Sequence, residues 1–316
     1  MKAYFIEQTQ AHTGLELREA PKPAAAAGKL LVRVHAASLN RGEFIRGHGL
    51  TKPGAAKPGG TDGAGEVVDT GARVMGRLPG AFAEYALMDE PDAIPVPANL
   101  SWEEAAAVPI TFLVVYDMLV QQGRLQPNEW LLVTGVSAGV GVAALLAAKA
   151  MGARVIGTSG SAEKLAKLKP LGLDVGVQTR GAQFYQPVMD ATGGKGVNLV
   201  INNVGGSVFA ETIRSLAYQG RHATVGYVDG VLKSELDLEA LHSKRLTLFG
   251  VSNKLRSAAE RAQTVQGFKR DWLPLFAAGK LKPLVDRVYE FAELPKAAER
   301  MQADAHVGKI VVRIST

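Results

Sequence analysis

Cysteine is absent from this chain of 316 residues. Disulfide bonds and thiolate metal ligands are therefore excluded, and a reducing, cytoplasmic location is expected. Long hydrophobic runs are also missing, because the most apolar helical stretch, 142–150, is much shorter than the ~20 residues of a membrane span. The first seven residues include an acid and have no extended apolar core, so we expect no signal peptide.

No part of the sequence concentrates charge of one sign. Lysine and arginine total 36 against 30 aspartates and glutamates, and the net charge of +6 suits anionic ligands. Because the basic residues are scattered, we read them as a solvated surface and expect no nucleic-acid partner. None of the seven tyrosines has a lysine four residues later, which argues against a short-chain reductase.

The first hundred residues carry short strand patterns separated by glycine and proline. Strands are expected at 1–6, 29–36, 65–69 and 82–88. Ser101 and Glu104 form a capping-box pattern before a helix that runs through Ala107, and a second helix is expected at roughly 111–122. These patterns predict a β-rich domain.

From Glu129 onward, strand and helix patterns alternate, which predicts a doubly wound parallel sheet with right-handed crossovers. A long helix near 256–278 follows. Two final strands, 284–289 and 309–314, have no helical partners and are expected to rejoin the β-rich domain. The predicted domains are 1–124 with 251–316, and 125–250. The expected sheet strands are 130–135, 154–158, 175–178, 198–203, 221–225 and 246–251, and the helices are 139–151, 161–170, 183–191, 207–217 and 237–243.

The most informative segment joins the first two strands of this sheet. A buried strand ends in Gly135-Val136-Ser137-Ala138-Gly139-Val140-Gly141, and an apolar helix follows. Small side chains let the backbone approach a pyrophosphate, and the helix N-terminus offers free N–H groups to hold it. The common dinucleotide fingerprint has glycine at 136, 138 and 141, whereas this chain has Val136, Ala138 and Gly141.

The end of the second strand indicates which dinucleotide is bound. NAD enzymes place a carboxylate against the ribose 2′-hydroxyl, about 20 residues past the first turn. Here the segment reads Thr158-Ser159-Gly160-Ser161, in which Ser159 and Ser161 are candidate donors to a 2′-phosphate. Lys164 lies just beyond, in the first turn of an expected helix, where the helix dipole disfavours a cation. We therefore predict an NADPH site.

Several further motifs, in order and spacing, complete the pattern: 32–43 (VRVHAASLNRGE), 60–68 (GTDGAGEVV), 80–85 (GAFAEY), 203–206 (NVGG), Gly220-Arg221 with Gly226, and 306–312 (HVGKIVV). Together with the coenzyme turn, they resemble the medium-chain dehydrogenase/reductase superfamily, in its zinc-independent quinone oxidoreductase branch. The resemblance spans the whole chain. It implies an α/β protein with a GroES-like β-rich catalytic domain and a Rossmann coenzyme domain, and a homodimer paired through strand 246–251.

The sequence departs from zinc-dependent relatives at their ligand positions. Those relatives carry cysteine where this chain has Asn40, and Gly-His-Glu where it has Gly60-Thr61-Asp62. No pair among the six histidines has metal-ligand spacing, so no metal is expected. Without zinc, an alcohol cannot be activated as a metal-bound alkoxide. The substrate is therefore expected to be a conjugated carbonyl, which accepts hydride with little acid help.

The resemblance also implies roles for individual residues. Asn40 would lie near the nicotinamide ribose and the substrate oxygen, which it would orient and polarise. Apart from the resemblance, Tyr227 follows Gly226 at the end of the fifth expected strand, where such folds bind ligands, and would either wall the pocket or pack against its neighbours. Asn40 and Tyr227 are the candidate catalytic residues. Arg46 and His48 are expected near the mouth of the site. The coenzyme contacts are assigned to Asn40, Ser137, Ala138, Gly139, Val140, Ser159, Ser161, Lys164, Arg180, Asn203, Val204, Gly226, Tyr227 and Val251.

We therefore predict an NADPH-dependent oxidoreductase that reduces quinones or α,β-unsaturated carbonyls bound in a cleft between the two domains. The protein would supply positioning and exclusion of water, and a proton from solvent or substrate would complete the reduction. An enoyl-thioester reductase of the same superfamily is an alternative. A non-catalytic, crystallin-like or RNA-binding protein that keeps the coenzyme fold is an alternative of another class.

Overall fold

The computed structural model describes residues 1–8, 13–44 and 54–315. The chain divides into two compact units, Met1–Leu113 with Arg256–Thr316, and Val114–Leu255. The sequence places the domain borders elsewhere, between residues 124 and 125 and between residues 250 and 251. Those domain limits stay a prediction. Among the described residues, no helix is both long and apolar enough to cross a lipid bilayer.

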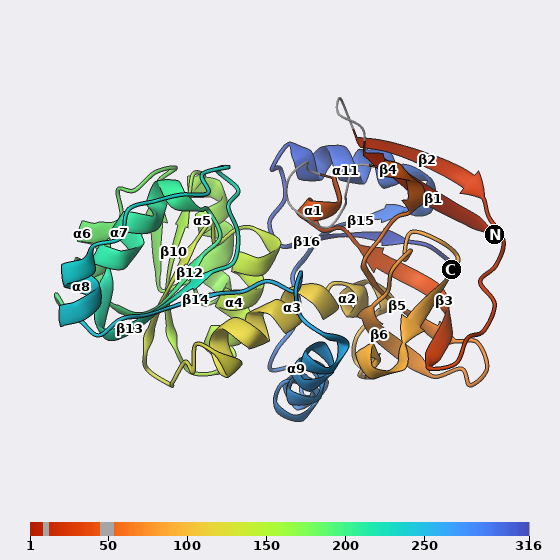
Figure 1. The fold of residues 1–316 in the computed structure, drawn as a ribbon, viewed down its shortest axis with the longest axis horizontal. Coiled ribbons are helices and arrows are strands. Elements are labelled where there is room, and N and C mark those ends of the chain that lie inside the picture. Colours follow the sequence, from red (N-terminus) through yellow and green to blue (C-terminus); the bar gives the residue numbers. More distant parts are fainter. Residues whose placement is uncertain (9–12, 45–53, 316) are drawn as a thin grey trace. The chain divides into compact units, whose positions relative to one another are not determined.

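The first unit is built on two β-sheets (Figure 1). In its described part, a three-stranded sheet has the order β2-β1-β4, and a larger sheet has the order β15-β16-β3-β5-β6-β8, with β7 also paired to β3. The strands are β1 (Lys2–Gln8), β2 (Thr13–Glu19), β3 (Lys29–Ser38), β4 (Gly54–Pro58), β5 (Asp62–Val67), β6 (Arg73–Arg77), β7 (Tyr85–Asp89), β8 (Ile94–Pro95), β15 (Val285–Glu290) and β16 (Lys309–Arg313).

Helices α2 (Trp102–Ala106) and α11 (Leu294–Gln302) pack against the larger sheet. Ser101 caps α2 with the predicted capping box, since its side chain accepts from the backbone N–H of Glu104 and the Glu104 carboxylate accepts from the N–H of Ser101. The apolar core of the unit includes Val34, Phe82 and Ile310, all fully buried. The helices are α1 (Arg41–Phe44), α2 (Trp102–Ala106), α9 (Ala258–Asp271), α10 (Leu273–Ala277) and α11 (Leu294–Gln302), with α3 (Pro109–Tyr116) and a π-helical turn (Asp117–Gln121) leading into the second unit.

The C-terminal part of the chain shows where the sequence-based prediction was incomplete. The two last strands do rejoin the N-terminal sheet, because β16 pairs with β3. The expectation that they lack a helical partner was wrong: α11 connects β15 to β16, which are parallel. Leu294, Ala297, Ala298 and Met301 form its buried stripe, with Pro295 in its first turn. The predicted helix 256–278 is instead two helices, α9 and α10, which meet at Trp272.

The second unit contains a parallel sheet of six strands in the described chain, in the order β11-β10-β9-β12-β13-β14. This is the predicted doubly wound Rossmann arrangement, and the α/β fold class is confirmed. The chain order reverses between β9 and β12, which is where such sheets bind ligands. The strands are β9 (Trp130–Thr134), β10 (Arg154–Ser159), β11 (Val175–Gln178), β12 (Val197–Asn202), β13 (Leu216–Thr224) and β14 (Thr247–Gly250).

Helices alternate with these strands as the sequence predicts. The expected helix 207–217 was too long, since α7 ends at Arg214 and Leu216 already begins β13. Val200, Ile201 and Leu132 on the central strands are fully buried, which accounts for their nearly continuous apolar sequences. The helices are α4 (Gly139–Ala150), α5 (Ala162–Leu168), α6 (Tyr185–Ala191), α7 (Phe209–Arg214) and α8 (Leu238–Ser243).

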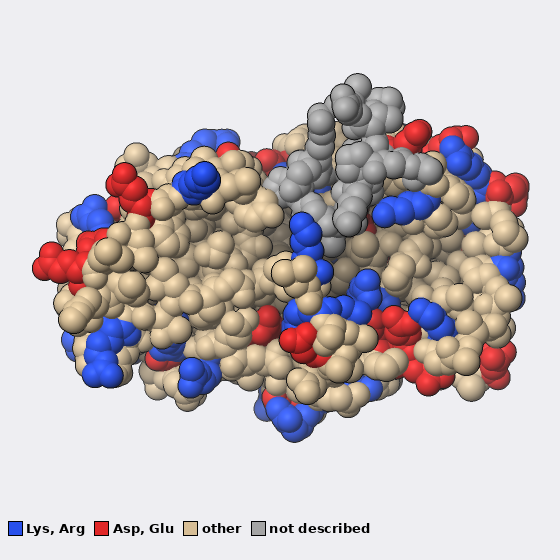
Figure 2. Space-filling view, in the orientation of Figure 1, with Lys and Arg blue, Asp and Glu red and all other residues tan. Residues whose placement is uncertain are grey.

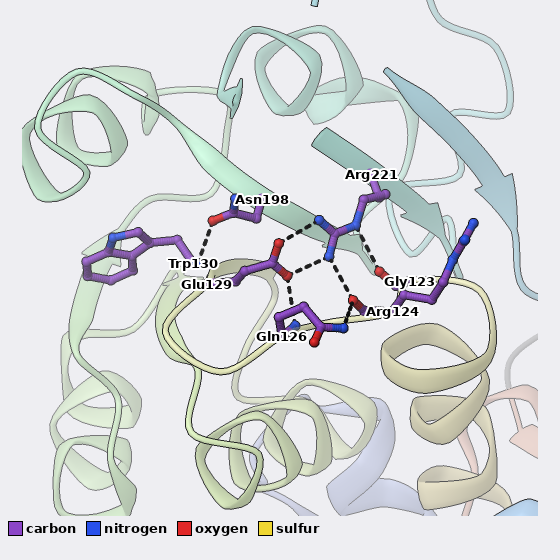
Figure 3. Close-up of polar contacts among 7 residues, drawn as sticks. All are labelled: Gly123, Arg124, Gln126, Glu129, Trp130, Asn198 and Arg221. Atoms are coloured by element: carbon purple, nitrogen blue, oxygen red, sulfur yellow. Dashed lines mark hydrogen bonds and ion pairs between the residues drawn. The ribbon is translucent and has the colours of Figure 1, made fainter. Parts of the chain in front are cut away.

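An ion pair fixes the amino-terminal edge of this sheet (Figure 3). The Arg221 guanidinium donates to both carboxylate oxygens of Glu129, at 2.8 and 2.6 Å, and to the carbonyls of Gly123 and Arg124. Burial alone would raise the pKa of Glu129, but the hydrogen bonds from Arg221 and from the N–H of Gln126 hold this pKa below its usual value. The pair thus ties the loop before β9 to β13.

Candidate functional site

The carboxyl ends of the parallel strands of the second unit meet at one edge of its sheet. The predicted coenzyme residues of this unit lie at or just after those ends: Ser159 is the last residue of β10, and the others lie in the segments that follow β9, β10, β11, β12, β13 and β14. Parallel αβ sheets bind ligands at this edge. Which of these residues contact a coenzyme stays a prediction.

The turn after β9 has the geometry of a phosphate-binding loop. Gly135 has a φ of +64°, which favours glycine. A side chain at Gly141 would place its Cβ 2.6 Å from the Gly135 carbonyl oxygen, so helix α4 can approach the turn only with glycine here. Ala138 is the N-cap of α4 and offers no side-chain cap. The first N–H groups of α4 therefore suit an anion.

Residues 135–139 also fit the Gly-x-Ser-x-Gly pattern of the hydrolase nucleophile elbow. A hydrolase would hold the Ser137 hydroxyl against a histidine. In the structure, its hydroxyl instead lies 3.3 Å from that of Ser159. The surroundings of Ser137 are therefore not those of the nucleophile in a catalytic triad, although residues 135–139 match the sequence pattern.

Hydroxyl and cationic groups gather at the end of β10. Ser159 Oγ accepts from the N–H of Ser161, and Ser161 caps α5 by accepting from the N–H of Lys164. The side chain of Arg180 lies over Gly160, because a Cβ at Gly160 would be 2.7 Å from Arg180 Cγ. Ser159, Ser161 and Arg180 are thus brought together, with Lys164 in the first turn of α5. A 2′-phosphate needs this combination of hydroxyls and positive charge.

The loop after β12 is held by a set of buried hydrogen bonds. Asn202 Oδ1 accepts from the Thr134 hydroxyl and from the N–H groups of Val204 and Gly205. Asn203 donates from its side chain to the Thr134 carbonyl and from its backbone to the Thr134 hydroxyl. The predicted contact residues Asn203 and Val204 are therefore fixed in place beside the end of β9.

The remaining predicted residues of this unit lie after β13 and β14. Gly226 approaches the carbonyl oxygen of Asn203 so closely that a Cβ would lie 3.0 Å from it. Tyr227 is 42% exposed, so part of its side chain lies at the surface. Val251 is buried, and its N–H donates to the Thr224 carbonyl.

In the first unit, the predicted residue Asn40 is half-buried and belongs to a polar cluster whose charged members are buried. Its side-chain nitrogen donates to Thr61 Oγ1 at 3.0 Å and to Asp62 Oδ1 at 2.8 Å. Its Oδ1 accepts from the Lys309 ammonium at 2.8 Å, and its backbone N–H donates to Glu43. Both amide hydrogens of Asn40 are engaged here, so polarising a substrate oxygen would require one of these bonds to be exchanged. The role of Asn40 stays a prediction.

The cluster holds two buried carboxylates and one ammonium, and sequence reasoning missed it as a unit. Burial and the neighbouring Asp62 charge raise the pKa of Glu43 to about 7, against hydrogen bonds from Thr61 and Asn40. Burial also raises the pKa of Asp62, although Lys309, Asn40 and Ser38 favour its charged form. The local pattern gives no signal for this cluster, because Lys309 reaches it only through the pairing of β16 with β3.

Asn40, Thr61 and Asp62 stand where zinc-dependent relatives have ligands, and here they bond to one another. Among the described residues, no group of three histidine, aspartate or glutamate side chains could hold a metal ion. Arg46 and His48, expected near the mouth of the site, lie outside the described residues. Lysine, arginine, aspartate and glutamate are interspersed over the face shown in Figure 2.

Comparison with known proteins identifies the family of the chain. Residues 139–265 match the family described as "Zinc-binding dehydrogenase". The quinone oxidoreductase of Thermus thermophilus, solved alone and with NADPH, is 30% identical over 99% of this chain and 100% of that chain, with a TM-score of 0.84. The chain belongs to the medium-chain dehydrogenase/reductase superfamily, in its zinc-independent quinone oxidoreductase branch. It is thus a member of a superfamily of oxidoreductases.

Two further relatives extend the comparison. The Escherichia coli quinone oxidoreductase, solved in complex with NADPH, is 25% identical over 99% of this chain and 100% of that chain, with a TM-score of 0.85. A phenolphthiocerol/phthiocerol polyketide synthase of Mycobacterium tuberculosis is 29% identical over 98% of this chain. The chain spans only 14% of the length of that synthase.

Proposed function

We propose that this chain uses NADPH to reduce quinones or α,β-unsaturated carbonyls. The observation that carries the proposal is the end of β10, where Ser159 and Ser161 stand in place of a carboxylate and the Arg180 side chain lies over Gly160. A 2′-phosphate would find hydroxyl donors and positive charge there, and no acid at residues 158–161 to repel it. The NADPH complexes of the two related quinone oxidoreductases support the same coenzyme.

Different segments of the second unit would bind different parts of the coenzyme. The uncapped first turn of α4 and the close approach allowed by Gly141 suit the pyrophosphate. The loop fixed by Asn202 supplies a rigid wall beside the end of β9. When bound, NADPH supplies the hydride. The chain's own contribution is to position the two reactants and to exclude water, rather than to activate the carbonyl with a metal.

Binding and turnover test this proposal together. NADPH should raise the thermal unfolding temperature markedly more than NADH at equal concentration, because only a ligand of the folded state stabilises it. NADPH oxidation should then depend on an added quinone or enone. Tighter binding of NADH, or no turnover of either substrate class, would reject the proposal.

An enoyl-thioester reductase is a second candidate function. It is favoured by the polyketide synthase match, which covers 98% of this chain. A thioester substrate should then show a higher kcat/KM than the matching enone that lacks the pantetheine arm. Equal kcat/KM values for the two substrates would favour the first proposal.

A homodimer through β14 is proposed with the same activity. β14 is the last strand in the sheet order of the described chain, and exposed edge strands pair readily. Light scattering of the purified protein would give the mass of a dimer. A monomer over the micromolar range would remove this part of the proposal.

A further inference from the structure

The hydroxyl of Thr61 connects the buried cluster of the first unit to a cavity. Thr61 Oγ1 lies 2.5 Å from Glu43 Oε1 and 3.0 Å from the side-chain nitrogen of Asn40. The cavity has a volume of about 230 Å³, and both Thr61 and Glu43 line it, with Gly60, Lys57 and Arg77. A molecule in this cavity can therefore meet a hydroxyl that is bonded to a buried acid.

The direction of the Thr61 hydrogen depends on the protonation state of Glu43. When Glu43 is ionised, Thr61 donates its hydrogen to Glu43 and accepts one from Asn40. When Glu43 is protonated, its carboxyl hydrogen is donated to Thr61, which then accepts two hydrogen bonds. A hydroxyl has one hydrogen and two lone pairs. The hydrogen of Thr61 is then released to a third direction, and an acceptor in the cavity can take it.

Glu43 is placed to be protonated near neutral pH. It is 1% exposed in the residue as a whole, and burial with the Asp62 charge raises its pKa to about 7. The backbone N–H of Asn40 bonds to Glu43 Oε2 at 2.8 Å and holds the carboxyl in its orientation toward Thr61. A general acid works best when its pKa lies near the working pH.

The charged groups on the elements around Glu43 set this balance. Asp62 on β5 favours the protonated form, and Lys309 on β16 favours the ionised form. Lys57 on β4 and Arg77 on β6 line the same cavity. On α1 itself, Arg41 is paired with Asp304, which follows α11.

We propose that Thr61 donates the proton that completes reduction of the substrate and that Glu43 replaces it. This inference rests on the proposed function. When bound, NADPH would supply the hydride to the electrophilic carbon and would become NADP⁺, and the electron pair of the double bond would move to the carbonyl oxygen. That oxygen takes the Thr61 hydrogen, the Glu43 carboxyl proton passes to Thr61 Oγ1, and Glu43 is left as a carboxylate that solvent reprotonates. Thr61 is the catalytic residue, and Glu43 acts through it.

Three substitutions separate this relay from a structural role. Glu43→Gln keeps the shape and a hydrogen-bond donor but cannot release a proton, Thr61→Val removes the hydroxyl at similar volume, and Thr61→Ser restores the hydroxyl. For the wild type, kcat should fall as the pH rises through about 7, because the protonated form is the active one. Glu43→Gln and Thr61→Val should each lower kcat below that pH by about 10²- to 10³-fold and abolish this pH dependence.

The pattern of the losses provides the controls. The double variant should be no slower than either single variant, because both changes interrupt one path. Thr61→Ser should recover kcat to within about tenfold of the wild type, and KM should change little in all variants, since the proton moves in the chemical step. Glu84→Gln, which also removes a carboxylate from the first unit, should leave kcat and its pH dependence unchanged.

The protonation state of Glu43 can also be measured directly, without turnover. In infrared difference titration of the wild-type protein, a carboxylic-acid C=O band should disappear as the pH rises through about 7 and be absent from Glu43→Gln. Because the Thr61 hydrogen bond lowers the pKa of Glu43, the band of Thr61→Val should persist to higher pH. A Glu43 band that titrates at the ordinary glutamate value would overturn the relay.

The two possible failures are distinguishable. If Glu43→Gln turns over substrate at the wild-type rate with the wild-type pH profile, the relay is wrong and the proposed function stands. If the wild-type protein oxidises NADPH with no quinone, enone or enoyl thioester, the proposed function is wrong and the relay falls with it.

Discussion

The side chain of Val136 occupies the space that a side chain at position 157 would need. A Cβ on Gly157 would lie 2.6 Å from Val136 Cγ1, and Val136 itself is fully buried. The usual fingerprint has glycine in the turn, at position 136. Here the larger residue, Val136, is in the turn, and the glycine is on the adjacent strand β10. The turn and the sheet therefore still pack closely, because the large and the small residue have changed places.

This exchange predicts the effect of Gly157→Ala. The added methyl group would force Val136 from its position, and overpacking of this kind costs about 1–3 kcal/mol in the free energy of unfolding. Gly176→Ala is the matched control, because Gly176 pairs with Gly157 in the sheet and its nearest neighbour would be an ordinary 3.4 Å away. Urea unfolding would measure both. A second change, Val136→Ala, should recover part of the loss, and equal stabilities for the two alanine variants would contradict the packing argument.

Coenzyme selectivity should depend on Arg180 and Ser159. Arg180→Ala removes a cation at the proposed 2′-phosphate position and should weaken NADPH binding by roughly tenfold, about 1.4 kcal/mol, with NADH unaffected. Ser159→Asp should reverse the preference, since it puts back a carboxylate against that phosphate. Isothermal titration of both coenzymes checks these effects. Arg154→Ala, at the opposite end of β10, is the control, and a similar loss in that variant would show a general charge effect instead.

Loss of the Glu129–Arg221 pair should destabilise the second unit. Each side chain is less than one-fifth exposed (17% and 19%), so removal of one partner leaves the other poorly solvated. Glu129→Gln or Arg221→Lys should each lower the free energy of unfolding by about 1–3 kcal/mol, less than for a fully buried pair. The exposed pair Glu163–Lys167 serves for comparison, and Lys167→Ala should cost under about 0.5 kcal/mol. Chemical denaturation measures these losses. Equal losses in the free energy of unfolding for the two pairs would contradict the prediction.

Two buried groups should oppose each other in the pH dependence of stability. The folded pKa of Glu43, about 7, lies above its unfolded value of 4.5, so the folded state binds more protons between these values and stability falls as the pH rises. Burial lowers the pKa of His222 from 6.5 to about 4, so the unfolded state binds more protons there and stability rises with pH. Between pH 4.5 and 6.5 the two slopes should largely cancel.

Single variants would separate the two slopes. Relative to Glu43→Gln, the wild type should lose on the order of 3 kcal/mol between pH 4.5 and about 7. Relative to His222→Gln, it should gain a similar amount between about pH 4 and 6.5. Urea midpoints measured across this range give both differences. A constant difference for either variant would show that its group titrates normally in the folded protein.

The second unit was largely predictable because its signals are local. The alternation of strands and helices, the small residues before α4 and the serines at the end of β10 lie in short contiguous segments, and the α/β fold class and the family were confirmed. The buried cluster was not predictable in this way. Lys309 is far from Asn40 and Glu43 in the sequence, and only the pairing of β16 with β3 brings it near them. The helix α11 had a visible signal, namely Pro295 followed by a three- and four-residue apolar repeat, that the strand pattern around it obscured.

The hydrogen bonds around Asn202 have a consequence for the kinetics of association. They order the loop after β12 in the chain by itself, since all three acceptor contacts of Asn202 Oδ1 are made within the protein. Binding of a dinucleotide therefore does not require this loop to become ordered. Association should follow one-step kinetics, in which the observed binding rate constant increases linearly with the coenzyme concentration.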